Sequence, residues 1–531
     1  MTNDPGAPMR RRDLLRLIGS VAGSTVMYQA MNTLGLNAES SYTGPISLEG
    51  NPRGASVLVL GAGLAGMVAA LELRKAGYSV RILEYQSRAG GRCWTIRGGD
   101  TVTELGGETQ TCTFDKDLYL NPGPWRIPSH HHAVMDYCRR LGVTLEPFMQ
   151  VNHNAYIHAK NAYGGKPQRF RHLKADYEGN VAELLAKVTS QGALDQAVTG
   201  GDKELLLQSL RSWGALDANY KYVKGPQSSD RRGFEKDPGG GLDAEPTFSE
   251  PGSFSAILQS RVWQQLATGD TYYHHNAMFQ PVGGMDGIAK GFEKQVGSLI
   301  RFNTKVTGIT QNEKGVSVSY VDANTGGNPS TATADWCVCT LPLTVLGQIP
   351  VQVSQPMAAA IQAVPYSPAF KVGLQFKRRF WEQDEEIYGG ISYTDTPISQ
   401  IGYPSSRFGD AGKGVLLAGY TFGVHAYEFA SLPAKERLAK ALEYGSQIHP
   451  QYKAEFDGGV SVAWHRVPWN LGCSGAWTDA MRAQHYKNLC ALDGRLVLAG
   501  EHASYIPAWQ EGAILSSLDA ITRLHRRVVT S

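Results

Sequence analysis

A glycine-rich turn stands between an apolar run and a segment with helical character. The apolar run is Val57–Leu60, and the glycines that follow it are Gly61, Gly63 and Gly66. At this spacing the first glycine permits a tight turn, the second lets the backbone approach a pyrophosphate, and the third lets helix and strand pack closely. The amide groups at the helix start, around Leu64 and Ala65, then face the phosphates, because the helix dipole favours negative charge there. The turn indicates a dinucleotide-binding fold; a plain glycine-rich turn is the alternative.

An acidic residue stands where ribose recognition needs one. Glu84 ends the strand-like run Tyr78–Leu83 and is followed by Tyr85. Its distance from the glycine turn is close to that of the carboxylate that bonds the ribose hydroxyls in such folds. A carboxylate at this place disfavours a 2′-phosphate, so NADP is not the expected cofactor.

A second glycine pair follows in residues 88–95, which read RAGGRCWT. Two adjacent glycines bring backbone close to a ligand, and an arginine offers a two-pronged fork to phosphate. The segment resembles the R-x-G-G-R-x-x-T segment that follows the dinucleotide fold in flavin amine oxidases, and this selects FAD over NAD. An ordinary basic loop is the alternative. The resemblance implies cofactor contacts from Arg88, Gly90, Gly91 and Arg92.

Two further blocks resemble the same family, so that the resemblance covers nearly the whole chain after residue 54. Residues 103–108, TELGGE, are similar to the E-L-G-G turn near the flavin ring, and residues 499–513 carry the G-E and W-x-x-G elements of flavin-dependent amine and amino acid oxidases. In the second block a buried strand turns into a helix whose positive end stabilises the charge of a reduced flavin. The strand-like run 300–309 is similar to the family's return to the FAD domain. The implied cofactor set adds Gly106, Gly107, Val306, Gly500, Glu501, Trp509, Gly512 and Ala513.

One arginine is placed in a stiff, apolar loop. Arg126 lies between Trp125 and Ile127 in residues 121–131, NPGPWRIPSHH, where three prolines restrict the backbone. The segment resembles the R-I-P-x-x-H segment of L-amino acid oxidases, whose arginine binds the substrate α-carboxylate. A fixed guanidinium can hold a carboxylate through two parallel bonds, whereas simple amines present no carboxylate. A surface arginine stacked on a tryptophan is the alternative. The histidines His130–His132 are interpreted as solvated or structural, and no metal site is expected.

A lysine occupies the polar face of an alternating strand. In Phe370–Phe376 the large apolar residues alternate with Lys371, Gly373 and Gln375, so the two groups lie on opposite faces. A glycine next to Lys371 on its own face leaves room for a ligand. Lys371 matches the lysine that, in flavin amine oxidases, holds a water against flavin N5 and assists the reaction with oxygen. A charge that guards a sheet edge is the alternative.

The resemblance also implies residues around the substrate. Tyr403 lies where the family places a tyrosine that bonds the substrate carboxylate, and Trp509, next to Ala508, is expected to form a wall of the amine pocket. Cys473, with Ser474 beside it, is expected to line this pocket as a small residue. Some monoamine oxidases attach FAD through a cysteine in a similar segment, so a covalent link at Cys473 is the alternative to non-covalent FAD.

The resemblance therefore implies an FAD-dependent L-amino acid oxidase. Arg126 and Tyr403 anchor the carboxylate, a hydride passes from Cα to flavin N5, and the imino acid hydrolyses to an α-keto acid and ammonia while oxygen becomes hydrogen peroxide. Aromatic residues in the implied pocket favour large apolar or aromatic side chains. The alternatives are a monoamine or polyamine oxidase, an L-amino acid 2-monooxygenase, a flavin-binding protein without turnover, and a dehydrogenase that passes electrons to a quinone.

An α/β fold must position these motifs. The expected architecture is a glutathione-reductase-like FAD-binding domain with a Rossmann-type parallel sheet, a mixed-sheet substrate domain and a helical insertion. A length of 531 residues also exceeds one simple core. Within the insertion, about 222–253 is rich in Gly and Pro and is expected to be a solvated, flexible loop. The expected boundaries are 1–53 for a leader or arm with its linker; 54–120, 281–340 and 485–531 for the FAD-binding domain; 121–160 and 341–484 for the substrate domain; and 161–280 for the helical region.

Composition limits the partners. The formal net charge is only +3 at pH 7, so no broad basic surface for nucleic acid is implied. No uncharged apolar run is long enough for a stable membrane span. The seven cysteines show no zinc spacing and are expected to be reduced and mostly buried. The expected partners are a small-molecule L-amino acid and molecular oxygen, and the family resemblance favours a homodimer or higher homo-oligomer.

The N-terminal segment differs from the rest. Arg10–Arg12 precede a mild apolar stretch that extends to about Leu36. The segment resembles a twin-arginine export signal, whose cargo folds around its cofactor before it crosses the membrane. Arg16 interrupts the apolar stretch and no A-x-A site follows, so cleavage is not expected. The predicted location is periplasmic or secreted if the leader works, and otherwise cytoplasmic; a basic amphipathic arm is the alternative.

Overall fold

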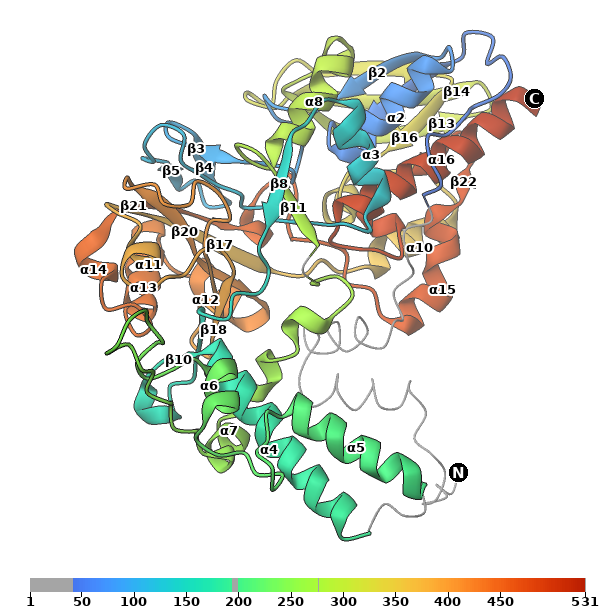
Figure 1. Cartoon of the computed structure of the whole chain (residues 1–531). Helices are drawn as coiled ribbons and strands as arrows, with labels where there is room; N and C mark the ends of the chain where they lie inside the picture. Colours follow the sequence, from blue (N-terminus) through green and yellow to red (C-terminus); the bar gives the residue numbers. More distant parts are fainter. Residues whose placement is uncertain (1–41, 193–198, 276, 531) are drawn as a thin grey trace, which may run out of the picture.

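The computed structural model describes residues 42–192, 199–275 and 277–530. Two large sheets form the centres of its upper and left parts, and a group of helices lies below them (Figure 1). A parallel sheet with helices beside a separate mixed sheet is an α/β arrangement, so the expected fold class is confirmed. Residues 1–41, which hold most of the predicted leader, lie outside the described residues.

A six-stranded sheet carries the glycine turn. Its strands, in order across the sheet, are β12 (Ile300–Arg301), β2 (Ser79–Leu83), β1 (Ser56–Leu60), β16 (Trp336–Cys339), β23 (Leu496–Leu498) and β22 (Leu492–Asp493). Neighbours are parallel except β22 and β23. In the centre, Leu60 is aligned with Leu83 on one side and Cys339 on the other. Helices cover one face of these strands, and strands and short helices within residues 306–364 cover the other. Burial on both faces explains the unbroken apolar runs.

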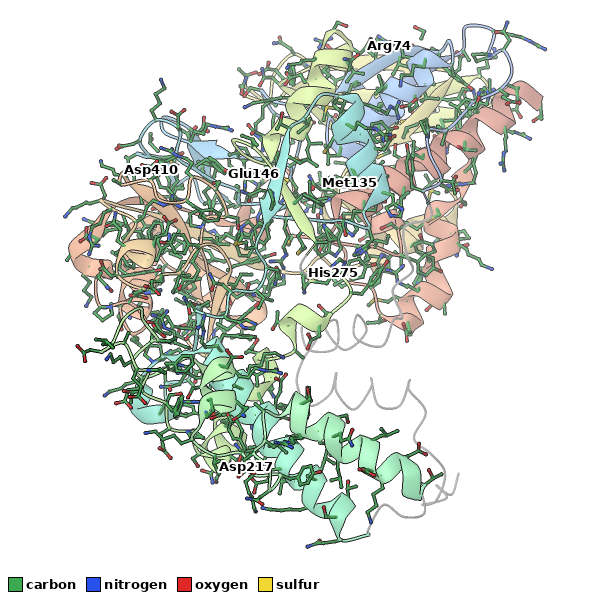
Figure 2. The ribbon with its side chains drawn as sticks, viewed as in Figure 1. Arg74, Met135, Glu146, Asp217, His275 and Asp410 are labelled. Carbon is green, nitrogen blue, oxygen red and sulfur yellow. The ribbon has the colours of Figure 1, made fainter. Side chains whose placement is uncertain are left out.

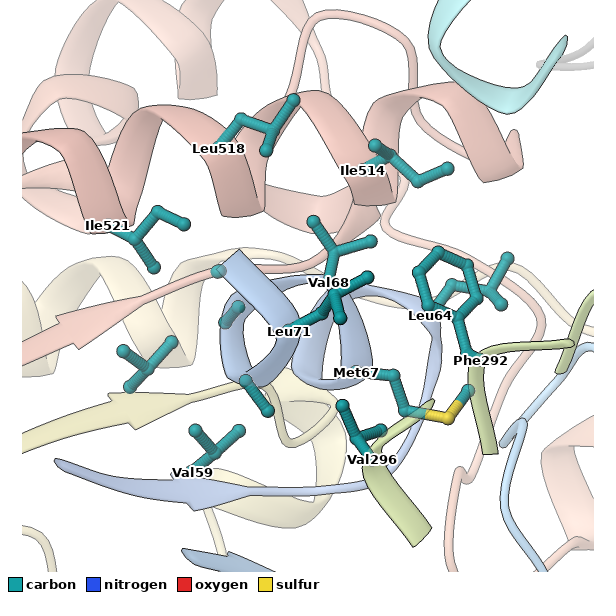
Figure 3. Packing of buried hydrophobic residues seen from close by; sticks show 14 of the residues in the cluster. Val59, Leu64, Met67, Val68, Leu71, Phe292, Val296, Ile514, Leu518 and Ile521 are labelled. Carbon is teal, nitrogen blue, oxygen red and sulfur yellow. The ribbon is translucent and has the colours of Figure 1, made fainter. Parts of the chain in front are cut away.

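Four helices share one core with this sheet. They are α2 (Leu64–Lys75), α3 (His132–Arg140), α8 (Asp286–Val296) and α16 (Gln510–Thr530). Figure 3 shows Met67 and Val68 of α2 among Phe292 of α8 and Leu518 of α16. Each such buried side chain contributes roughly 1.5–3 kcal/mol. Helix α3 packs in this core against α16, although the sequence pattern places residues 121–160 with the substrate domain.

A seven-stranded mixed sheet carries Lys371. Its strands, in order, are β10 (Gln168–Arg169), β9 (Tyr156–His158), β18 (Ile391–Thr394), β19 (Gln400–Gly402), β20 (Gly414–Phe422), β17 (Ala369–Phe376) and β21 (Phe456–Ala463). Only the β9–β18 pair is parallel among these strands. The expected alternation in β17 is confirmed, since Phe370, Val372, Leu374 and Phe376 share a core. Lys371 on the opposite face is aligned with Tyr420 of β20.

Shorter sheets and helices complete the two parts. The small sheets consist of β7 (Ile127–Pro128), β11 (Met278–Pro281) and β8 (Leu145–Phe148); β13 (Thr304–Asn312), β14 (Gly315–Asp322) and β15 (Ser330–Ala334); β3 (Ile96–Arg97) and β6 (Tyr119–Leu120); and β4 (Thr101–Thr103) and β5 (Thr109–Thr111). The remaining helices here are α9 (Leu343–Leu346), α10 (Gln355–Ala363), α11 (Phe380–Gln383), α12 (Gly423–Ala430), α13 (Ala434–Gly445), α14 (Tyr452–Glu455) and α15 (Asp479–Cys490).

The helical region corrects one expectation about solvated loops. Its helices are α4 (Phe170–Ser190), α5 (Gly200–Trp213), α6 (Pro226–Arg232) and α7 (Phe254–Ser260). Helix α6 lies inside the segment 222–253, and Ser228, Ser229 and Arg232 in it are buried. Arg232 forms an ion pair with buried Asp176 of α4. An arginine can stay buried when a carboxylate neutralises it, so this part of the segment is packed and not a solvated loop.

All seven cysteines are free thiols, five of them buried, as expected for a reduced set. Within the described ranges, no helix is both long enough and apolar enough to cross a membrane.

Candidate active site

A single cavity of about 910 Å³ is lined by residues from both sheets and from the start of α16. Two parts of its wall differ in character. The glycine-turn part consists of Gly61, Gly63, Leu64, Ala65 and Glu84. The arginine part consists of Arg126, His274, Lys371, Tyr420 and Trp509. The cavity therefore brings the predicted dinucleotide site and the predicted substrate residues together.

The glycine turn is shaped by close backbone approach. Gly61 has a φ of +98°, and a Cβ on Gly66 would lie 2.0 Å from the carbonyl oxygen of Gly61. A Cβ on Gly63, in contrast, would point into open space with nothing within 4 Å. Gly63 is the N-cap of α2, so amide N–H groups without helical partners face the cavity beside it. This is a cradle for a phosphate group, which a side chain on Gly63 would fill.

The carboxylate of Glu84 is fixed by backbone donors. It ends β2, is buried, and accepts hydrogen bonds from the amide of Ala62 at 2.6 Å and of Gln86 at 2.9 Å. Burial raises the pKa of Glu84, and the two amide bonds oppose this shift. Tyr85 and Gln86 line the cavity next to it. A rigid acceptor at the end of the strand beside the glycine turn suits a ribose hydroxyl.

Arg92 is neutralised within the protein. Its Nη1 donates to the carboxylate of Glu501 at 2.7 Å and to the carbonyl of Cys473 at 2.6 Å. Burial opposes the charge on Glu501, but Arg92 outweighs it and the pKa of Glu501 lies below its ordinary value. Glu501 also accepts from the amides of Gly475 and Ala508. The pair lines the cavity, and it ties the start of the C-terminal block to the segment around Cys473.

Lys371 is fully buried in the arginine part. Its Nζ donates to the carbonyl oxygens of Gly123 at 2.6 Å and Asn121 at 3.2 Å, and lies 4.4 Å from the ring centre of Tyr420. Burial lowers the pKa of Lys371 to about 7, and the nearby charge of Arg126 acts in the same direction. The sheet-edge alternative does not hold, because β17 has neighbours on both sides.

Arg126 reaches the same cavity from the loop before β7. Its Nη2 lies 3.0 Å from Nε2 of His274, and its guanidinium carbon is 5.1 Å from the ring centre of Trp125. Trp509 lies nearby, with its ring centre 6.1 Å from that of His274. Ala508, Cys473 and Ser474 also line the cavity, as the sequence led us to expect.

Tyr403 is a correction, because the structure does not bring it to this cavity. Its hydroxyl lies 2.7 Å from both Ser392 Oγ and His449 Nε2 in the core of the mixed sheet. His449 is held in turn by Glu385 at 3.0 Å. Tyr403 lines a separate cavity of about 80 Å³. The tyrosine that does line the main cavity is Tyr420, which is aligned with Lys371 across β17 and β20. No local signal in the sequence marks it.

Six residues that the sequence predicted as cofactor contacts also do not line the cavity. They are Gly66, Arg88, Gly106, Gly107, Val306 and Gly512. Gly66 packs against the glycine turn itself, and a Cβ on Gly512 would lie 2.1 Å from the carbonyl oxygen of Ile506. Arg88 donates to the carbonyls of Ala89 and Gly91 and so supports the loop that lines the cavity.

Three of these positions belong to other parts of the fold. Gly106 and Gly107 form the turn between β4 and β5, where Gly106 approaches Arg466. Val306 is a core residue of β13. Glu104, which precedes the glycine pair in the E-L-G-G turn, pairs with buried Arg437 and accepts a hydrogen bond from the amide of Ala463 in β21, so this turn is attached to the mixed sheet.

A family model described as flavin containing amine oxidoreductase matches residues 64–524. The chain therefore belongs to this family of flavin enzymes, and it is an oxidoreductase that uses FAD. The open space at Gly63, the fixed carboxylate of Glu84 and the size of the cavity fit a bound dinucleotide.

Three similar proteins extend this comparison. YobN of Bacillus subtilis (strain 168), named provisionally as an L-amino-acid oxidase, is 29% identical over 481 residues, which cover 88% of this chain and 94% of that protein. The L-amino-acid oxidase of Siganus canaliculatus is 28% identical over 485 residues, covering 89% and 86%. The solved structure of wild-type putrescine oxidase bound to putrescine has a TM-score of 0.55 and 18% identity, covering 90% of this chain and 98% of that one, and it shares the fold.

Proposed function

We propose that the protein is an FAD-dependent L-amino acid oxidase. The observation that carries the proposal is the place of Arg126 in the wall of the cavity that also contains Lys371 and Trp509. A guanidinium in a largely apolar wall favours an anionic ligand, and the α-carboxylate is the anion that distinguishes amino acids from amines. The names of the relatives from Bacillus subtilis and Siganus canaliculatus support the same substrate class.

The glycine-turn part would hold FAD through the backbone at Gly63, Leu64 and Ala65 and the carboxylate of Glu84. Gly90 and Gly91 add backbone to the same wall. Bound FAD would supply the hydride acceptor for the substrate Cα–H and the route by which the electrons reach oxygen, which becomes hydrogen peroxide.

The residues of the arginine part orient and select the substrate. Arg126 fixes the carboxylate, so the neighbouring Cα takes up a defined position. The aromatic walls exclude water and disfavour the ammonium form, so the amine binds neutral and needs no strong protein base. Lys371 would hold a water molecule at the reacting side. Its two carbonyl partners, which fix Nζ, and its pKa, lowered by burial to about 7, support this role. The imino acid product then leaves and hydrolyses to an α-keto acid and ammonia.

The rings around the cavity favour large apolar or aromatic substrate side chains. The rings that line it include Trp125, Tyr420, Phe422, Trp464, Trp469 and Trp509. Large flat side chains gain the most from such walls, through burial and ring contacts.

A peroxide-coupled screen of L-amino acids, their D-forms and the matching amines tests the proposal. We expect peroxide from L-phenylalanine and L-leucine, and little from D-phenylalanine or phenethylamine. Preference for the amines would instead support a monoamine or polyamine oxidase. An amide product with loss of CO₂ would support an L-amino acid 2-monooxygenase.

We also propose non-covalent FAD, a homodimer or higher homo-oligomer, and export through the twin-arginine route. Release of the yellow colour on acid precipitation tests whether FAD is non-covalent, since a link at Cys473 would keep the colour with the protein.

Light scattering of the purified holoenzyme tests the oligomeric state. For export, changing Arg11 and Arg12 to lysine should leave active enzyme in the cytoplasm; unchanged location would contradict the proposal.

A further inference from the structure

We infer that His274 is a positioning residue for Arg126: its imidazole accepts a hydrogen bond from the guanidinium and so orients the remaining donors toward a carboxylate. The inference rests on the proposed function, because it concerns the same carboxylate site. It adds a residue from the helical region, where the sequence pattern gives no chemical role to any side chain.

The contact itself fixes the chemical state of His274. Arginine has N–H donors and no acceptor, and it stays protonated in proteins. The 3.0 Å contact between Arg126 Nη2 and His274 Nε2 is therefore a hydrogen bond only if Nε2 is the acceptor. The imidazole must then be neutral, with its proton on Nδ1. A protonated ring would replace an acceptor with a second positive charge beside Arg126.

The surroundings of His274 favour this neutral state. Burial and the charge of Arg126 hold the pKa of His274 well below its ordinary value. The neighbouring ring is the indole of Trp509, with its centre 6.1 Å away. His131, whose ring centre lies 4.9 Å from that of Trp509, and His130 beside it also have pKa values lowered by burial and so add no positive charge near neutral pH.

The segment that carries His274 is anchored on both sides. The amide of His274 donates to the carbonyl of Thr271, and the amide of Ser129 donates to the carbonyl of Ala277 at the edge of the β7–β11 pair. Tyr273 is buried and stacks on Trp509 with ring centres 5.7 Å apart. Figure 2 shows the neighbouring His275 where this segment passes from the lower helices to β11. The ring of His274 is thus preorganised, and it limits the rotation of a long, flexible arginine.

Two variants separate positioning from simple filling of space. His274→Leu keeps an apolar volume but removes the acceptor, whereas His274→Gln keeps an acceptor oxygen at a similar reach and does not titrate. The probes are benzoate and its uncharged analogue benzamide. Benzoate carries a carboxylate but no α-amino group, so it can bind without being oxidised. Binding is followed through the absorbance of the bound flavin in the full-length holoenzyme.

We expect His274→Leu to weaken benzoate binding about tenfold and to leave benzamide within about twofold, since one orienting hydrogen bond is lost. His274→Gln should restore benzoate binding to within about threefold of wild type. With L-phenylalanine, the leucine variant should raise KM far more than it lowers kcat. If the leucine variant does not retain FAD, His274→Asn, whose amide is too short to reach Arg126, replaces it in the comparison.

Equal benzoate binding by wild type and the leucine variant would overturn the inference, as would a glutamine variant as weak as the leucine variant. Arg126→Met measured with the same probes separates the two proposals. If that variant also binds benzoate normally, the proposed carboxylate site fails. If it loses benzoate while His274→Leu does not, only the positioning role of His274 fails.

Discussion

The two parts of the cavity wall are built in different ways. The glycine-turn part presents mainly backbone, from a turn in which Gly66 meets Gly61 with no room for a Cβ. The arginine part presents side chains, each aimed by a partner from another segment: Arg126 by His274, and Lys371 by the carbonyls of Gly123 and Asn121. The glycine-turn part therefore depends on close backbone packing, which any added side chain would disrupt. The arginine part depends on separate hydrogen bonds, each of which a single substitution can remove.

The largest effect should come from adding a side chain inside the glycine turn. Gly66→Ala places a methyl group 2.0 Å from a backbone oxygen, which costs about 3 kcal/mol or more because the backbone must move. We expect little folded holoenzyme, measured by flavin content and melting temperature. Gly63→Ala is the matched control: its methyl group enters open space, so the protein should fold but bind FAD weakly. Normal FAD binding by both variants would contradict the cradle.

A smaller effect is expected at the ion pair that ties the start of the C-terminal block to the segment around Cys473. Glu501→Gln leaves Arg92 without its counter-charge at a mostly buried contact, and should lower the free energy of unfolding by about 3 kcal/mol. Since the pKa of Glu501 is lowered in the fold, the wild-type advantage is present above the ordinary value of 4.5 and is lost as the pH falls below it.

Chemical denaturation of wild type and Glu501→Gln at pH 7 and pH 4 checks this difference. Glu443→Gln, which alters an exposed pair with Lys440, is the control and should change stability by less than about 1 kcal/mol. A Glu501→Gln variant as stable as wild type at pH 7 would show that the pair does not hold these two segments together.

A still smaller effect is expected at Tyr403, which lies in the core of the mixed sheet and does not line the main cavity. Tyr403→Phe leaves His449 and Ser392 without a buried hydroxyl partner, so unfolding should become easier by about 1–3 kcal/mol. KM for L-phenylalanine should change less than about twofold, because the side chain does not face the main cavity. Tyr388→Phe at an exposed site should change neither quantity. A large rise in KM for Tyr403→Phe would return this residue to the substrate site.

The same contrast explains what the sequence could predict. The glycine-turn part lies in one short stretch, Gly61 to Glu84, whose spacing reflects local backbone geometry, and the structure places these residues together. Arg126 and Lys371 were predictable because a stiff loop and an alternating strand mark them locally. His274 and Tyr420 were not, since they reach the cavity through β-pairing between segments far apart in sequence.

The misplaced residues have a common physical reason. Val306, Gly106 and Gly107 lie in motifs similar to those of the family, but their positions depend on how neighbouring strands pair and pack. Tyr403 lies at the end of β19, where its hydroxyl meets His449 inside the core. The buried ion pair between Arg232 and Asp176 joins two helices that are far apart in the sequence. The Gly- and Pro-rich composition of the segment around Arg232 gives no indication of this contact, so the sequence could not predict it.

The central claim is that Arg126 selects amino acids by their carboxylate, and Arg126→Met tests it most directly. The measurement is kcat/KM for L-phenylalanine and for phenethylamine, with FAD content matched and Arg126→Lys as the variant that keeps the charge but loses the fork. We expect the methionine variant to lose about 10²–10³-fold on the amino acid, as for a charged pair worth several kcal/mol, and to change less than about threefold on the amine. Equal losses on both substrates, or no loss on the amino acid, would contradict the account.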